Sequence, residues 1–128
     1  MDLLSLLAKH KANVFCGHIH HTTFTRYRSE EGEITQTSLF SQVPPNPPKF
    51  EILSEGDGNA YFSQKAIAAA LETQNAAGKL IQEYQGKIVE YAAFGPAAGF
   101  VIVDIDKGIK VNLHQRGAKE ADHSITIR

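Results

Sequence analysis

Short segments in which hydrophobic and polar residues alternate predict that much of this chain is β-structure. The first pair of such segments, Thr22 to Arg28 and Ile34 to Ser41, is rich in threonine and aromatic residues. The two segments flank Ser29-Glu30-Glu31-Gly32-Glu33, a polar turn that contains glycine. We therefore expect a β-hairpin in which the two segments pair as antiparallel strands.

A second hairpin is expected near the end of the chain. Residues 100–105 and 109–113 alternate in polarity on either side of Asp106-Lys107-Gly108, which is a favourable sequence for a tight turn. The segment 124–128 is a candidate for one further strand. We accordingly expect residues 99–128 to form a C-terminal β-hairpin unit.

The first residues predict a short amphipathic helix that leads into a strand. Asp2 is a suitable N-cap, four leucines form one broad apolar face, and basic residues around Lys9 suit a helix C-terminus. Asn13 is the expected stop, and the apolar run Val14-Phe15-Cys16 predicts a buried strand that ends at Gly17. A helix followed by a buried strand is the order in which an α/β protein places polar ligands at the carboxyl end of a strand.

The middle of the chain is expected to begin with a linker. Residues 44–58 contain four prolines followed by a glycine-containing polar stretch. Prolines remove backbone donors and hold the chain extended, which is typical of a stiff surface connector. A proline-rich ligand for a partner protein is the alternative. Phe50 to Leu53 is a candidate short strand within this segment.

A helical region is expected over residues 59–93. Ile67, Ile81 and Ile88 recur at multiples of seven positions, which indicates one apolar helix face. Two glycines interrupt the pattern, and each costs about 1 kcal/mol relative to alanine in a helix. The region is therefore expected to be one long helix or a broken one. We expect its apolar stripe to pack in the core, and a dimer seam is the alternative.

The composition describes one globular domain, residues 1–128, and excludes several classes of protein. Hydrophobic residues make up 42% of the chain and charged residues 21%. The 13 basic and 14 acidic residues give a net charge of -1, so no basic field indicates nucleic acid or an anionic membrane. No apolar run approaches the ~20 residues of a membrane helix. The first seven residues lack the features of a signal peptide, so a cytoplasmic location is expected for the chain as it stands.

Two histidines form the candidate site. In Gly17-His18-Ile19-His20, side chains two positions apart in an extended segment point to the same side. His18 and His20 can therefore face one site, and neutral imidazole is the commonest metal ligand. Two protein ligands are too few for a tight site, since even catalytic zinc has three. His21 is an immediate neighbour and is expected to point the other way.

The other histidines and the single cysteine predict no site. His10 suits the C-terminus of the first helix, His114 is expected at an exposed strand end, and His123 is expected in a solvated loop. Cys16 lies in an apolar run and is expected to be buried rather than to act as a nucleophile. No catalytic residue is assigned.

The segment from Lys11 to His21 resembles the last signature block of the calcineurin-like metallophosphoesterases. In that family a helix leads into a short apolar strand that ends in Gly-His-x-His, as Gly17 to His20 do here. The match covers about Leu3 to Ser41, and a looser match runs from Gly99 to Leu113.

This resemblance implies the fold, the metals and the substrate class. The complete family fold is a four-layer α/β sandwich, so this chain by itself is expected to be an α+β piece that corresponds to the C-terminal half. His18 would ligate one divalent metal and His20 the other, in a pair of Mn, Fe or Zn ions at the carboxyl ends of strands. Such a pair activates a bridging water and hydrolyses phosphate mono- or diesters.

The earlier signature blocks of the family are missing from this chain. Gly56-Asp57 has Ala60 where the second aspartate should be, and Gly58-Asn59 is followed by alanine rather than histidine. We therefore expect the C-terminal part of a metal-dependent phosphoesterase that is inactive alone. Its partners would be the missing N-terminal half or a second copy, because half a sheet leaves an unpaired edge and an uncovered apolar face.

Two alternatives from other functional classes remain open. The chain is a non-catalytic oligomerising or binding module in which the histidines are vestigial, or it is a metal-binding protein that uses His18, His20 and a group from a second subunit. Metal that is lost on His20→Ala without any phosphatase activity would favour the metal-binding protein.

Overall fold

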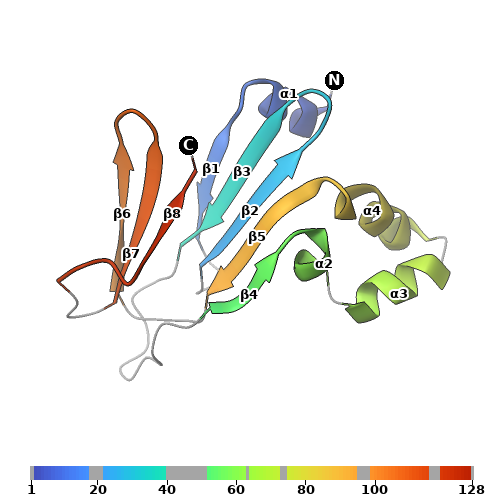
Figure 1. Cartoon of the computed structure of the whole chain (residues 1–128). Helices are drawn as coiled ribbons and strands as arrows, with labels where there is room; N and C mark the ends of the chain where they lie inside the picture. The colour runs from blue at the N-terminus through green and yellow to red at the C-terminus, as the bar shows by residue number, and fades with distance from the viewer. Residues whose placement is uncertain are drawn as a thin grey trace.

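The computed structural model describes residues 2–17, 22–39, 52–62, 64–72, 75–94, 99–115 and 119–127. In these residues the protein is an α+β protein with two β-sheets and four helices (Figure 1). The helices are α1 (Leu3–Lys9), α2 (Gly58–Tyr61), α3 (Gln64–Glu72) and α4 (Ala76–Gln85). The strands are β1 (Asn13–Cys16), β2 (Thr23–Arg28), β3 (Glu33–Ser38), β4 (Ile52–Gly56), β5 (Ile88–Phe94), β6 (Gly99–Ile105), β7 (Ile109–Gln115) and β8 (His123–Thr126).

The larger sheet has five strands in the order β1-β3-β2-β5-β4. The predicted hairpin of β2 and β3 is confirmed, and it pairs from Thr23 opposite Ser38 to Arg28 opposite Glu33. Strand β1 runs parallel to β3, whereas all other neighbours in this sheet are antiparallel. The carboxyl ends of β1, β3 and β5 therefore lie at the same end of the sheet as the amino ends of β2 and β4.

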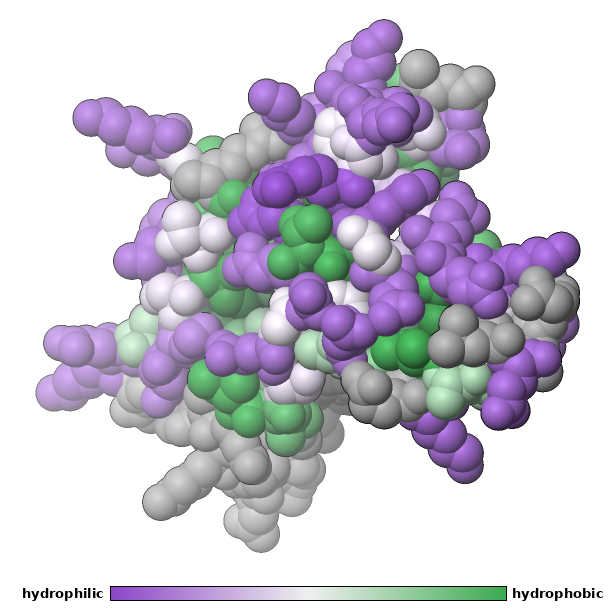
Figure 2. Space-filling model, turned by 45° about the vertical axis from the view of Figure 1, so that its right-hand side comes forward, coloured by the Kyte–Doolittle hydropathy of each residue, from purple (hydrophilic) through white to green (hydrophobic). Residues whose placement is uncertain are grey.

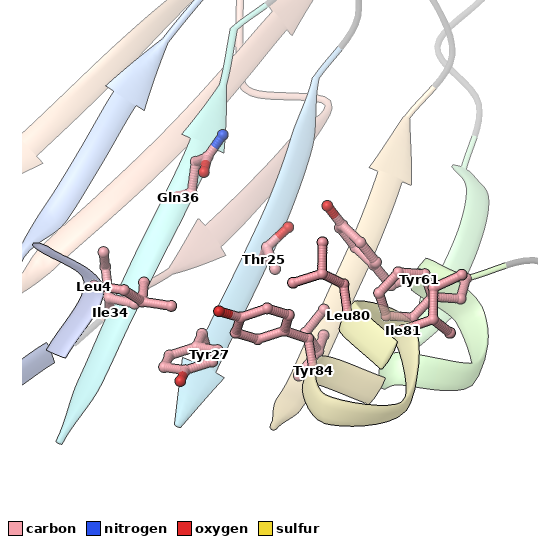
Figure 3. Close-up of a pocket in the computed structure, with 11 residues that line it drawn as sticks. Leu4, Thr25, Tyr27, Ile34, Gln36, Tyr61, Leu80, Ile81 and Tyr84 are labelled. Carbon is pink, nitrogen blue, oxygen red and sulfur yellow. The ribbon is translucent and has the colours of Figure 1, made fainter. Parts of the chain in front are cut away.

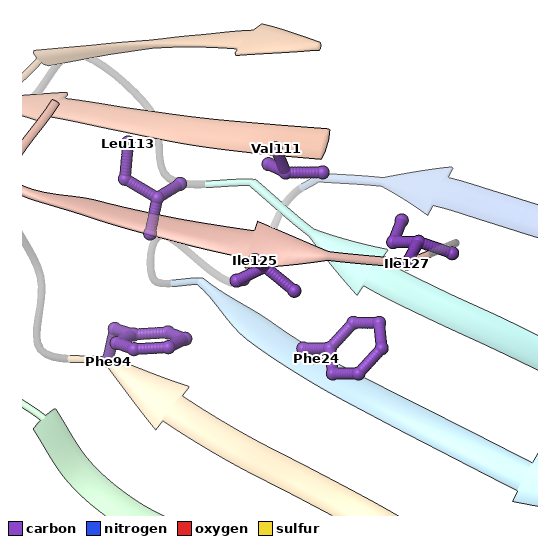
Figure 4. Close-up of a cluster of buried hydrophobic side chains, with 6 residues drawn as sticks. All are labelled: Phe24, Phe94, Val111, Leu113, Ile125 and Ile127. Atoms are coloured by element: carbon purple, nitrogen blue, oxygen red, sulfur yellow. The ribbon is translucent and has the colours of Figure 1, made fainter. Parts of the chain in front are cut away.

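The smaller sheet is an antiparallel meander of β6, β7 and β8. The predicted C-terminal hairpin is confirmed, and the candidate further strand is present as His123–Thr126. The two sheets pack face to face, since side chains from both contribute to one apolar cluster (Figure 4). That cluster consists of Phe24, Phe94, Val111, Leu113, Ile125 and Ile127.

Helix α1 begins as predicted, because the side chain of Asp2 accepts a hydrogen bond of 2.8 Å from the backbone N–H of Ser5. The leucine face of α1 is only partly buried, since Leu3 and Leu6 are exposed and Ala8 is the fully buried residue of the helix. The prediction of a buried strand after it is wrong. Strand β1 lies at the edge of the sheet, its Phe15 is exposed, and Cys16 is half-buried rather than buried.

The predicted helical region over residues 59–93 is wrong in its second part. Three short helices replace the long one, and the segment from Ile88 to Phe94 is strand β5. Helix α4 ends at Gly86, and the following residues pair on both sides, with β2 and with β4. The backbone groups of β5 are thus satisfied by strands on both sides. The spacing in multiples of seven residues that relates Ile88 to Ile67 and Ile81 in the sequence therefore does not reflect a shared helix face.

The predicted linker over residues 44–58 is also partly wrong. Its described part contains strand β4 and the start of α2, where the Asp57 side chain accepts from the backbone N–H of Asn59 at 2.9 Å. The proline-rich part, residues 44–51, lies outside the described residues. Apolar side chains also reach the surface of the molecule, and Figure 2 shows them as separate green patches among hydrophilic side chains.

Candidate functional site

The candidate ligands His18 and His20 lie outside the described residues, together with His21. The structure instead describes both flanks of the segment that carries them. Strand β1 ends at Cys16 before the histidines, and β2 begins at Thr23 after them. Both flanks lie at the end of the sheet where β3 finishes, because Cys16 and Thr23 are each paired with Ser38.

A set of hydrogen bonds holds these flanks to the end of β3. The backbone N–H of Thr23 donates to Ser38 Oγ at 2.9 Å, and the two hydroxyl oxygens lie 2.7 Å apart. On the other side, the backbone N–H of Leu39 donates to the carbonyl of Cys16 at 2.9 Å. Thr22 is fully buried, and its carbonyl accepts from the N–H of Phe94 at 2.9 Å. The histidine segment is therefore connected at both ends to ordered, hydrogen-bonded strands.

Gly17 stands between β1 and the candidate ligands in the sequence. A Cβ atom built on Gly17 would meet no heavy atom of the described residues within 4 Å. The described residues therefore leave room for a side chain at this position. No group of three or more histidine, cysteine, aspartate or glutamate side chains in the described parts of the chain could hold a metal ion.

The predicted positions of two other histidines are wrong. His114 is 9% exposed instead of lying at an exposed strand end, and its ring stacks on Phe100 with centroids 4.7 Å apart and an interplanar angle of 5°. Its Nδ1 atom is buried and has no hydrogen-bond partner among the described residues. His123 is half-buried in β8, with its ring 4.9 Å from that of Phe94. Pairing of β7 with β6 places His114 inside the sheet, and pairing of β8 with β7 does the same for His123, which their polar sequence neighbours did not indicate.

His10 and Cys16 each have a structural role in the described residues. His10 is the C-cap residue of α1, as predicted, and it is exposed. The thiol of Cys16 accepts a weak hydrogen bond from Gln36 Nε2 at 3.6 Å. An amide donor does not remove the thiol proton, so this pair lacks the general base that a cysteine nucleophile requires.

A separate apolar groove of about 340 Å³ lies on the face of the five-stranded sheet opposite the one that packs on the smaller sheet (Figure 3). Strands β2 and β3 form its floor with Thr25, Tyr27, Ile34 and Gln36, and the helices α1, α2 and α4 contribute the sides. Among the described residues, no charged side chain lines this groove. Sequence patterns did not indicate the groove, because its residues come from six separate elements, of which the sixth is β5 with Ile88.

Comparisons with known proteins find no match among protein-family models, curated protein sequences or solved structures. Within the described parts of the chain, every helix is too short or too polar to cross a membrane. The features that bear on function are therefore the residues of the Gly-His-x-His motif and the hydrogen bonds that fix the strands on either side of it.

Proposed function

We propose that this chain supplies two ligands, His18 and His20, to the dinuclear metal site of a phosphoesterase that hydrolyses phosphate mono- or diesters. The remaining ligands would come from polypeptide outside residues 1–128. One observation carries this proposal. Strand β1 runs parallel to β3, and its carboxyl end leads directly through Gly17 into His18 and His20. The carboxyl ends of parallel strands are where α/β enzymes place their ligands.

The donor set of this chain fits one half of such a site. Two imidazoles provide one nitrogen ligand for each of two divalent ions of the Mn, Fe or Zn type. The complete pair would lower the pKa of a bridging water and neutralise charge on the phosphoryl oxygens. A bridging carboxylate is missing from the motif residues, so we derive no hydrolytic step for this chain alone. Its part is to hold the two imidazoles at the end of β1, between flanks fixed to Ser38.

The first test of this proposal is metal binding by the isolated chain. Equilibrium dialysis against Mn²⁺ should show weak binding by the wild type and loss of binding by the His18→Ala/His20→Ala double variant. His10→Ala is the matched control, because His10 is an exposed C-cap residue that precedes β1, whereas the motif follows the other end of that strand. Equal binding by the wild type and the double variant would contradict the assignment of these ligands.

The second test concerns the reaction. Bis(p-nitrophenyl) phosphate should not be hydrolysed by residues 1–128 with Mn²⁺, because two of the required ligands do not complete a site. The mass of the endogenous protein, measured with an antibody to this region, shows whether a longer product exists. A longer product or a complex with an upstream polypeptide should hydrolyse the ester, and His20→Ala should abolish that activity. Retention of full activity by His20→Ala would exclude the proposed role.

A second candidate function is that of a non-catalytic assembly module. It is favoured by one specific observation, an exposed apolar strand at the edge of the smaller sheet. In this case the isolated chain self-associates through that strand whether or not metal is present. The two functions are compatible, because the edge strand lies in the smaller sheet and the strands that flank the histidine segment lie in the larger one.

A further inference from the structure

Strand β6 is the longest edge strand of the described structure. The two sheets end in β1, β4, β6 and β8. Strand β6 has seven residues, whereas the others have four or five. Its pairing with β7 is continuous from Gly99 opposite Gln115 to Ile105 opposite Ile109. Strand β4, in contrast, contains a register shift, which is one of the irregularities that make an edge unsuitable for further pairing.

The side chains of β6 are apolar on both faces. Val101 and Val103 pack against the cluster between the sheets. Phe100 and Ile102 point to the other face, where they are 47% and 44% exposed. Asp104 is the only charged residue, and the strand contains neither lysine nor proline. Strand β6 therefore lacks the devices by which edge strands normally avoid pairing with another chain.

We propose that β6 pairs with β6 of a second copy of this chain, antiparallel and about a two-fold axis, so that the two small sheets join into one six-stranded sheet. The register that pairs all seven residues places Ile102 opposite Ile102 of the second copy. Val101 then lies opposite Val103 of the second copy, so the inner apolar layer continues across the axis. A two-fold contact of identical strands is closed, and it produces a dimer rather than a fibre.

The charge on the strand supports this register. Asp104 lies opposite Phe100 of the second copy, so the two Asp104 carboxylates are four residues apart along the pair, about 13 Å. This separation exceeds the screening length of about 10 Å at 0.1 M salt, so the repulsion between them is small. A register that places the two carboxylates directly opposite each other is disfavoured by their like charge.

Two isoleucine-to-lysine substitutions, one at the proposed contact and one away from it, test the proposal. Ile102→Lys places two ammonium groups opposite each other at the two-fold axis, and Ile52→Lys makes the same change on the edge strand β4, where Ile52 is 46% exposed. Light scattering coupled to size exclusion should show a concentration-dependent dimer for the wild type. Ile102→Lys should raise its dissociation constant at least about tenfold, since like charges opposite one another destabilise strand pairs. Ile52→Lys should leave it unchanged.

A disulfide experiment tests the register without destabilising the strand. In a Cys16→Ser background, Ile102→Cys should give a disulfide-linked dimer on mild oxidation, because opposed residues of paired strands lie within disulfide distance. The matched variant Ile52→Cys should form no disulfide-linked dimer in the same background, because β4 lies outside the proposed contact. Circular dichroism of each variant checks that it is folded.

Three results would overturn the proposal. They are a monomeric wild type at every concentration, an unchanged dimer in folded Ile102→Lys, and dissociation by Leu80→Lys in the groove instead of by Ile102→Lys. None of these measurements uses metal or substrate, so failure here is distinguishable from failure of the proposed phosphoesterase role.

Discussion

The guanidinium group of Arg26 on β2 donates to the carbonyl oxygen of Ile127, from Nη1 and from Nη2 at 3.2 Å each. These two residues are 101 positions apart and belong to different layers of the protein. The same guanidinium donates to Glu33 Oε1 at 2.6 Å and to Glu90 Oε2 at 2.8 Å. Arg26 thus joins three strands of the large sheet to the C-terminal segment that follows the small sheet.

Substitution of Arg26 should weaken the contact between the two sheets. The compact ammonium group of lysine lacks the planar fork by which Arg26 reaches two carboxylates and a carbonyl from separate nitrogens. Arg26→Lys is therefore expected to lower the free energy of unfolding by about 1–3 kcal/mol. Arg28→Lys is the matched control, because Arg28 also bonds to Glu33 but its side chain is 60% exposed. The control should lose less than about 1 kcal/mol. Urea denaturation measures both values, and equal losses would contradict this role of Arg26.

Stability should fall in acid because of Glu33. Burial opposes ionisation of this carboxyl, but hydrogen bonds from Arg26 and Arg28 outweigh it and hold the pKa of Glu33 below the ordinary value of 4.5. A folded-state pKa below the unfolded one contributes stability that is present above the unfolded pKa and is lost as the pH falls through the folded pKa. Glu33→Gln should therefore unfold more easily at pH 7 and show a smaller decrease between about pH 5 and pH 3. Parallel pH profiles for wild type and variant would refute this source of acid sensitivity.

Two glycines should respond in opposite ways to alanine. A Cβ on Gly58, the first residue of α2, would overlap the backbone carbonyl of Gln85 at the end of α4. Gly58→Ala must separate α2 from α4, and it should cost about 1–3 kcal/mol. Gly86 has an ordinary φ of -77°, and a Cβ there meets no atom within 4 Å. Gly86→Ala should be neutral or should stabilise by up to about 1 kcal/mol, as thermal unfolding can measure.

Substitution by valine should change the stability of the protein in different ways at two buried threonines on β3. Thr37 is fully buried, and its Oγ1 has no hydrogen-bond partner within the described parts of the chain. Thr37→Val removes an unsatisfied group and should be neutral or stabilising. Thr35 is 2% exposed, and its hydroxyl donates to Asn13 Oδ1 at 2.8 Å. Thr35→Val leaves the amide of Asn13 without this donor and should cost about 1 kcal/mol. Similar losses in both variants would show that Thr37 has a partner in solution.

Short-range patterns predicted the elements whose formation depends on neighbouring residues. Both hairpins form where alternating segments flank a turn, and α1 begins at Asp2 because a side-chain oxygen can satisfy a backbone N–H three residues away. The two segments of a hairpin are brought together by a few turn residues, so local sequence is sufficient to specify their pairing. The order of helix, strand and Gly-His-x-His was also visible without a structure.

The incorrect predictions concern residues whose state depends on distant partners. Ile88 continues a helical recurrence in the sequence, yet β5 pairs with β2 and β4 on its two sides. His114 and His123 have polar neighbours, but pairing within the meander buries His114 and half-buries His123. Phe15 is apolar and still exposed, because β1 has a neighbouring strand on one side only among the described residues.

The sequence by itself determined the α+β character of the protein, its two hairpins, and the position of the candidate ligands directly after a strand. The tertiary structure decided that β5 is a strand, that the two sheets pack face to face around Phe24 and Phe94, and that β6 remains at an edge. The physical reason is the range of the interactions. Turns and caps are satisfied within a few residues, whereas burial, sheet order and edge exposure are set by segments as far apart as Arg26 and Ile127.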